Sequence, residues 1–444
     1  MVNNLTEGSI IKNLLRFSLP YLLACFLQTF YGLADLFIIG QFNGAASITA
    51  VSVGSQVTHM LTVIIVGLAM GSTVTISRAI GAKNSAEAAK GIGNTVLVFG
   101  IFAIVATIVL LIFTDGIISI LATPTEAIAE TKEYLTVCFI GVPFIVGYNV
   151  ISSIFRGLGD TKRPMYFVAI AGVINIILDY IFIGPLGMGA MGAALATIIA
   201  QCCSVILALI AMKRIDLGVS VGKNDLKYDS KISKDIIRVG SPIALQDGFI
   251  QIAFLVITII ANMRGVDVAA AVGIVEKVIC FMFLVPSAML SAVSALVAQN
   301  VGAGKHDRGR KTLAYGIYIS VAVGIFFALV CQFKADWIIS VFSKTEPDVI
   351  VLGAQYLKAY ALDCAIAGVH FCFSGYFCAY QRSMLSFAHN LASIVLVRIP
   401  GAYLAAVLFP ATLYPMGLAA PLGSLLSSII CIVAYLKLRK TAFC

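Results

Sequence analysis

The stretch that decides the fold is SLPYLLACFLQTFYGLADLFIIG, residues 18–40, an apolar run in which Asp35 is the single charged side chain. A helix needs about 20 such residues to cross a hydrocarbon core about 30 Å thick, because its backbone polar groups find no water there. Lys12 and Arg16 precede the run, as in a signal peptide, but no small-residue cleavage site follows. A charged residue such as Asp35 is also not expected in the apolar region of a signal peptide. The run is therefore predicted to be a permanent membrane span.

The rest of the chain repeats this pattern. The 444 residues are 60% hydrophobic and 11% charged, whereas soluble domains are about 45–50% apolar. Apolar runs, separated by charged or Gly/Pro clusters, predict an all-α membrane protein with twelve transmembrane helices. The spans are expected at roughly 14–38, 46–72, 92–114, 134–155, 164–184, 189–212, 238–262, 268–298, 312–334, 354–380, 386–409 and 414–436.

The two halves of the chain are related by an internal repeat with a period of about 222 residues. The opening run aligns with SPIALQDGFIQIAFLVITIIA, residues 241–261, and ISRAIGAKNSAEAAKG from Ile76 aligns with VAQNVGAGKHDRGRKT from Val297. Each repeat holds six spans, so both halves enter the membrane from the same side and the repeat is parallel. This predicts an N-lobe over 1–212, a cytoplasmic linker over 213–237 and a C-lobe over 238–444, a layout typical of secondary transporters.

The basic residues predict the orientation. Most of the 30 Lys and Arg residues fall in the loops on the side of the N-terminus, which the positive-inside rule places in the cytoplasm. We therefore expect a multi-pass protein of the plasma membrane, the inner membrane of the cell, with both termini cytoplasmic. The net charge of +9 then reflects topology and proximity to anionic membrane lipids, and no nucleic-acid partner is expected.

Two acids lie inside spans of the first half, where an ionisable group needs a partner or a function. From a rise of 1.5 Å per residue, Asp35 lies about 28 Å and Asp179 about 24 Å from the cytoplasmic surface. Asn175 precedes Asp179 by one turn, and Thr197 reaches a matching depth on the sixth span. These four side chains predict a site that either holds a hard cation such as Na⁺ or shares a proton. The alternative is that each acid only hydrogen-bonds a neighbouring helix.

The second half carries a different set of embedded polar groups. In the alignment of the two repeats, Ile257 corresponds to Asp35 and Gly401 corresponds to Asp179. Because neither counterpart is charged, ion coupling is expected in the first half. Asp363, His370 and Arg398 lie on adjacent spans, where structural ion pairing competes with substrate contact. The candidates for a substrate cavity are Gln246, Asp247, Gln251, Glu276, His370 and Arg398.

Enzymatic motifs do not accompany the spans, so we expect neither an enzyme nor a cofactor. The GxGxxG match at Gly187 opens a membrane span without a preceding strand, and small residues there favour close helix packing. VGAGKHD from Val301 lacks the first glycine of a phosphate-binding loop, because position 299 is Gln299. The 11 cysteines are expected to be small buried hydrophobic residues, without a metal or disulfide role.

Six segments, in this order, resemble the multidrug and toxic compound extrusion (MATE) family of the MOP flippase superfamily. They are SLP with Asp35 in the first span, IGAK from Ile80, FRGLGDTKRP from Phe155, NIILDYIFI from Asn175, GMGAMGAALAT from Gly187 and AVSALVAQNVGAGK from Ala292. Together they cover essentially the whole chain. Asp35, Asn175, Asp179 and Thr197 match the first-lobe ion site of the DinF-like branch, whereas the seventh span lacks the Glu of the NorM branch.

The resemblance implies two six-span lobes, alternating access, and multidrug efflux of xenobiotics by antiport against H⁺ or Na⁺. The expected substrates are organic cations or amphipathic compounds, and the expected assembly is a monomer. A cavity lined by aromatic and Met side chains suits planar amphipathic monocations, because apolar contact and cation–π attraction tolerate many shapes. The runner-up is a lipid-linked precursor flippase of the same superfamily, which would favour a cationic cavity, and only Lys277 and Arg398 are embedded here.

Overall fold

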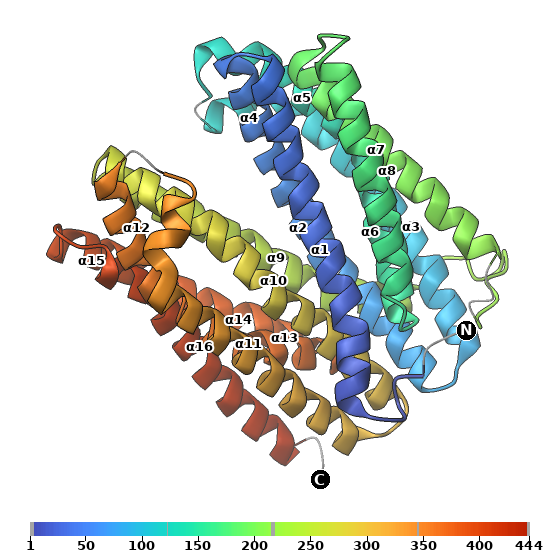
Figure 1. Ribbon diagram of the computed structural model, residues 1–444. Helices are drawn as coiled ribbons and strands as arrows, with labels where there is room; N and C mark the ends of the chain where they lie inside the picture. The colour runs from blue at the N-terminus through green and yellow to red at the C-terminus, as the bar shows by residue number, and fades with distance from the viewer. Residues whose placement is uncertain (1–3, 122, 215–217, 344–345, 442–444) are drawn as a thin grey trace. The chain divides into compact units, whose positions relative to one another are not determined.

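The protein is an assembly of helices joined by short turns (Figure 1). The computed structural model describes residues 4–121, 123–214, 218–343 and 346–441, and no β-strand occurs within these ranges. Eleven helices are long and apolar enough to cross a membrane, and a bent pair, Thr125–Ile140 with Val142–Gly157, supplies a twelfth crossing. The predicted class, an all-α membrane protein with twelve transmembrane helices in two six-helix lobes, is confirmed.

Two compact units divide the chain. The first contains residues 1–4 and 19–240, and the second contains residues 5–18 and 241–444. These bounds differ from the predicted lobes 1–212 and 238–444 and the predicted linker 213–237: residues Leu5–Ser18 group with the second unit, and the first unit extends to Gly240. The helices α1 (Ile10–Phe42) and α9 (Ser230–Asn262) each contribute residues to both units.

The first unit is a bundle of long helices. Besides residues 19–42 of α1, its elements are α2 (Ala45–Gly81), α3 (Ser85–Ile112), α4 (Thr114–Ile120), η1 (Thr125–Ala127), α5 (Ile128–Ile140), α6 (Val142–Gly157), α7 (Lys162–Ile183) and α8 (Gly189–Arg214). Within it α7 packs along α8, and α2 packs along α6 (Figure 1). The predicted fourth span, 134–155, is the bent pair, with a 48° change of direction between Ile140 and Val142.

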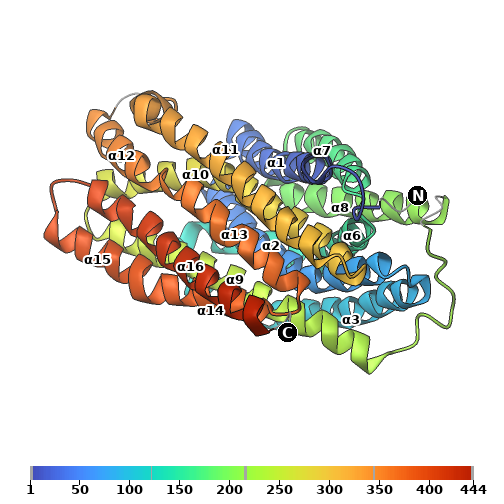
Figure 2. The ribbon, with the colours of Figure 1, turned by 90° about the horizontal axis from the view of Figure 1, so that it is seen from below.

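The second unit repeats the plan with two modified spans. Its elements, after residues 241–262 of α9, are α10 (Val266–Gly302), α11 (His306–Ser340), α12 (Pro347–Tyr360), α13 (Asp363–Ala379), α14 (Ser383–Ser393), η2 (Ile394–Arg398), α15 (Ile399–Leu408) and α16 (Tyr414–Thr441). The tenth span is broken between α12 and α13, and the eleventh contains η2, a π-helical turn. α16 packs against α13, α14 and η2 (Figure 2).

The surface of α3 shows why this is a membrane fold. Its most apolar window has a mean hydropathy of 3.0, yet only 17% of that window is buried inside the protein. Ile101, Ile104, Ile108 and Ile112 are 64%, 61%, 53% and 70% exposed and recur at helical spacing, so they form one outward face. An apolar face of this kind is stable against lipid tails and unfavourable against water.

The segment predicted as a linker is shorter than expected, and residues 215–217 lie outside the described residues. α8 continues to Arg214 and α9 begins at Ser230. Within the first unit, the Asn94 side chain of α3 forms hydrogen bonds with the residues around the start of α9. Its Oδ1 accepts from the Asp229 N–H at 2.7 Å and from the Ser233 hydroxyl at 3.0 Å, and its Nδ2 donates to the Lys227 carbonyl at 3.3 Å.

Candidate functional site

Three helices of the first unit carry the predicted ion site. Asp35 lies on α1, Asn175 and Asp179 lie on α7 one turn apart, and Thr197 lies on α8. α1 meets α7 through the rings of Phe42 and Tyr180, whose centroids are 5.6 Å apart. Because α7 and α8 pack along each other and α1 contacts α7, polar residues on the facing sides of these helices converge.

The structure brings these side chains together. The Thr197 hydroxyl donates to Asp35 Oδ2 at 3.4 Å and accepts from Asn175 Nδ2 at 3.5 Å. Asp179 lies close enough to Asp35 for the two carboxylates to interact electrostatically. Asp35, Asn175 and Asp179 are 3%, 1% and 0% exposed, and Thr197 is half-buried. Both predicted acids therefore meet inside one helical bundle, although Asp35 and Asp179 are 144 positions apart in the chain.

Several oxygens at this site have no hydrogen-bond donor among the described residues. They are Oδ1 of Asp35, Oδ1 of Asn175 and both carboxylate oxygens of Asp179. Buried oxygens of this kind are costly unless they bind something, since most buried polar atoms in proteins are satisfied. Carboxylate, amide and hydroxyl oxygens are the donors that a hard cation prefers, and two adjacent carboxylates can also be joined by one shared proton. The donor set therefore fits Na⁺ or a proton.

Two further residues belong to this polar cluster and were not predicted. Gln201, one turn beyond Thr197 on α8, donates from Nε2 to the Tyr31 hydroxyl at 3.3 Å, and Tyr31 lies one turn before Asp35 on α1. The Oε1 atom of Gln201 has no donor in the described part of the chain. The signal in the sequence was the spacing of four residues, which places each of them on the same helix face as a predicted site residue.

The substrate-cavity candidates fall into separate contact groups within the second unit. Glu276 of α10 accepts from the Thr258 hydroxyl at 3.2 and 3.3 Å. Arg398 pairs with Asp363 at 2.6 Å, and His370 contacts the Ser424 hydroxyl at 3.3 Å and the ring of His389. The α9 candidates comprise buried Gln246 and half-buried Asp247 and Gln251. Their role in binding substrate stays a prediction.

Aromatic and Met side chains, the residue types expected to line a substrate cavity, also differ in their surroundings. Phe30 is exposed, while Met282 is buried in the core of the second unit. Phe283 packs edge-on against Tyr360 and Phe371, with centroid distances of 6.5 and 6.1 Å. The aromatic and Met side chains thus include both exposed and packed residues, so residue type alone does not identify a cavity wall.

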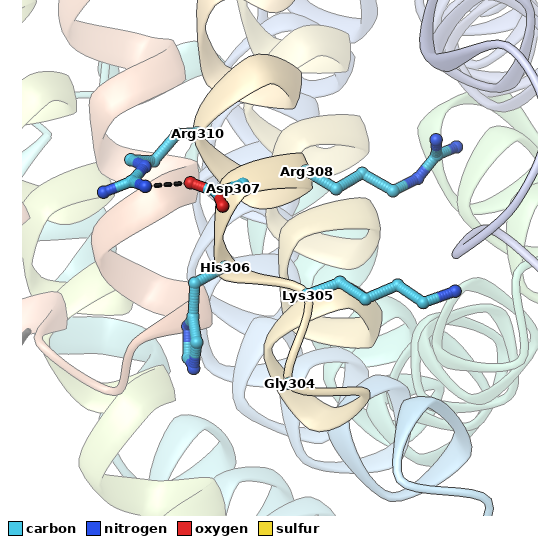
Figure 3. A pocket seen from close by; sticks show the side chains of 6 residues that line it. All are labelled: Gly304, Lys305, His306, Asp307, Arg308 and Arg310. Atoms are coloured by element: carbon cyan, nitrogen blue, oxygen red, sulfur yellow. Dashed lines mark hydrogen bonds and ion pairs between the residues drawn. The ribbon is translucent and has the colours of Figure 1, made fainter.

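A hollow of about 500 Å³ lies at the turn between α10 and α11, lined by Gly304, Lys305, His306, Asp307, Arg308 and Arg310 (Figure 3). Its cations already have internal partners. Lys305 donates to the Thr6 carbonyl at 3.0 Å, Arg308 donates to the Glu7 carbonyl at 2.8 Å, and Arg310 pairs with Asp307. Lys305 and Arg308 thereby hold the segment that leads into α1. We assign no ligand to this hollow.

A duplicated bundle of twelve apolar spans with buried polar clusters is typical of polytopic membrane transporters. Among the described residues, no group of three or more His, Cys, Asp or Glu side chains is placed to hold a metal ion, and the cysteines are free thiols.

The chain belongs to the MatE family, whose model matches residues 20–181 and again residues 242–404. The double match follows the internal repeat. Members of this family are transporters, so the expectation that the chain is not an enzyme is confirmed, and its substrates are small molecules.

Individual relatives cover almost the whole chain. It is 28% identical over 396 residues to a probable multidrug resistance protein of Bacillus subtilis (strain 168), YpnP, covering 89% of this chain and 88% of the relative. It is 27% identical over 443 residues to a FAD transporter of Shewanella oneidensis (strain MR-1), covering 97% and 95%. A solved structure of an outward-facing multidrug resistance MATE transporter is similar in fold, with a TM-score of 0.91, 23% identity and coverage of 99% and 97%.

Proposed function

We propose that this protein is an antiporter of the plasma membrane that exports cationic, amphipathic compounds by alternating access, driven by inward movement of Na⁺ or H⁺. The observation that carries the proposal is the cluster of buried oxygens around Asp35 and Asp179, several of which have no donor among the described residues. Both termini are cytoplasmic in this proposal, as the distribution of basic residues indicates.

Each residue of the cluster has a defined task in this mechanism. Asp35 and Asp179 supply the negative charge that attracts the coupling cation or holds the proton. Thr197 and Asn175 supply neutral oxygens that complete the coordination and link α7 and α8 to α1. Because the site draws ligands from three helices, occupancy stabilises the arrangement in which all three are close. A bound cation therefore shifts the population of the two access states by its difference in affinity for them.

Efflux from proteoliposomes tests the coupling. The purified protein is reconstituted, loaded with an ethidium-like dye and exposed separately to a Na⁺ gradient and to a pH gradient. We expect at least one gradient to accelerate dye movement, and a matching ionophore to abolish the acceleration. Transport that is insensitive to both gradients would contradict the proposal.

The substrate class needs a second experiment in cells that lack their own exporters. Cells that express the chain should retain less ethidium-like dye than vector controls, and an uncoupler or ionophore should remove the difference. Relatives include multidrug resistance proteins and a FAD transporter, so an anionic dinucleotide is a suitable comparison substrate. Equal dye retention together with clear activity on a lipid-linked sugar or an anionic metabolite would overturn the assignment to organic cations.

A further inference from the structure

The internal repeat lets the two units be compared position by position. Residues 222 positions beyond the acids of the first unit are Ile257 and Gly401, neither of which is charged. The second unit nevertheless has embedded acids of its own at other positions. Asp363 corresponds to Gly141, and Glu276 corresponds to Gly54. Asp247, a third embedded acid of the second unit, corresponds to Cys25, so no embedded acid of one unit corresponds to an embedded acid of the other.

A buried cation accompanies the acids of the second unit. Arg398 corresponds to Ile176, the neighbour of Asn175, and so lies on the counterpart of α7. Its Nη2 atom lies 2.6 Å from Asp363 Oδ2, and the two side chains are 11% and 0% exposed. The first-unit site contains acids and neutral donors, whereas this second polar centre includes its own guanidinium.

The backbone around Arg398 is shaped to admit this side chain. Arg398 ends the π-helical turn η2, in which the Ile399 N–H bonds to the Ile394 carbonyl. Pro400 follows and cannot donate a backbone hydrogen bond, which favours such a local widening of the helix. Gly423 of α16 leaves room for the aliphatic stem: a Cβ atom there would lie 2.6 Å from Arg398 Cγ and 2.7 Å from Ser393 Oγ. The ion pair thus depends on two local features outside the pair itself.

We propose that Arg398 is a permanent cation that neutralises Asp363 in the second unit, just as an exchangeable Na⁺ or proton neutralises the acids of the first unit. By neutralising Asp363 permanently, it keeps this acid from binding an exchangeable coupling ion. This inference rests on the proposed function of the Asp35 site. It makes Arg398 a residue that determines the ion stoichiometry of transport.

Other titratable groups surround the pair and enter the test. Tyr356 and Tyr360 of α12 are buried near Arg398, and Glu276 of α10 interacts electrostatically with both tyrosines. His370 of α13 also interacts with Arg398. None of these supplies a permanent positive charge comparable to a guanidinium, which remains protonated in proteins. Removal of Arg398 therefore leaves Asp363 without a fixed counter-charge.

The test is to count bound coupling ions in purified protein, by radiolabelled Na⁺ binding and by proton release on Na⁺ addition across a pH series. Arg398→Gln should bind one further Na⁺ or hold one further proton per chain, because Asp363 must be neutralised by an exchangeable cation. Asp363→Asn and the doubly neutral pair D363N/R398Q should keep the wild-type count. The double variant also serves as the folding control, since it buries no unpaired charge.

Three results would overturn the inference. One is a folded R398Q variant with an unchanged ion count. The others are a lowered count in D363N, or in D363N/R398Q, because Asp363 would then be a coupling ligand in the native protein. If R398Q does not fold, these two variants still decide the question. Asp35→Asn tests the proposed coupling site separately. If this variant keeps the wild-type ion count, the proposed coupling site is wrong. The role of Arg398 is judged only by comparing R398Q with D363N/R398Q.

Discussion

The Thr197 hydroxyl lies 3.4 Å from the Asp35 carboxylate, although 162 positions separate the two residues in the chain. The same hydroxyl accepts from Asn175, so it connects helices α1, α7 and α8 at one point. A neutral side chain thereby takes part in orienting a carboxylate at the site we propose for ion coupling. This relationship can be tested directly.

Thr197→Val removes the hydroxyl and keeps the shape of the side chain, whereas Thr197→Ser keeps the hydroxyl. We expect Val to weaken binding of the coupling ion by about 10- to 100-fold, since a lost hydrogen bond to a charged group costs about 1.5–3 kcal/mol. Ser should stay within about threefold of wild type, which corresponds to less than 1 kcal/mol. The measurement is the ion concentration or pH that gives half-maximal efflux in proteoliposomes. Equal half-maximal values for Val and Ser would exclude a role for the hydroxyl.

Asp35→Asn and Asp179→Asn should each abolish ion-driven efflux. The amide removes the negative charge with little change in volume, so expression and thermal stability should stay near those of the wild type. Asp267→Asn, at an exposed position in the first turn of α10, is the matched control and should transport normally. A wild-type rate for either buried variant under a defined gradient would disprove the coupling role of that acid.

Gly54→Ala should destabilise the first unit. The added Cβ would lie 2.1 Å from the ring of Tyr134, a buried residue of α5, so the helices or the ring must move. Overpacking of this kind costs about 1–3 kcal/mol. Gly100→Ala on α3 meets nothing within 4 Å and should be neutral or slightly stabilising. Thermal unfolding in detergent compares the two, and an equal melting temperature for both would refute the contact.

Arg264 holds the turn between α15 and α16. Its Nη2 lies 3.1, 2.7 and 3.3 Å from the carbonyl oxygens of Phe409, Pro410 and Thr412. Arg264→Ala should lower stability by about 1.5 kcal/mol, because hydrogen bonds from a charged guanidinium to three backbone carbonyls are lost, and solvent at these exposed positions compensates part of the loss.

The control for Arg264 is Lys132→Ala, which removes an exposed ion pair with Asp115 and should cost about 1 kcal/mol or less. Both variants are compared by thermal unfolding. An Arg264 variant as stable as the Lys132 variant would show that the turn is held by other contacts.

The sequence alone determined the class of fold, because bilayer thickness and backbone hydrogen bonding require long apolar helices. It also determined the repeat, which is visible as aligned residues and needs no packing information. The positions of Asp35, Asn175, Asp179 and Thr197 along the membrane normal followed from helical rise, which is a local property of the chain. Their roles in coupling stay predictions, while their meeting in one cluster is a finding of the structure.

Tertiary structure decided what depth alone leaves open. Residues at one level in a membrane can face lipid, a neighbouring helix or each other, and only helix rotation and packing choose among these. Helix packing places Tyr31 and Gln201 in hydrogen-bond contact within the cluster. The π-helical turn η2 and the space beside Gly423 allow Arg398 to form its ion pair with Asp363. The 48° bend of the fourth span also depends on packing, since the apolar run there continues across the interruption at Gly141. Periodicity thus predicts which segments are helices, and side-chain contact between helices decides which polar groups become partners.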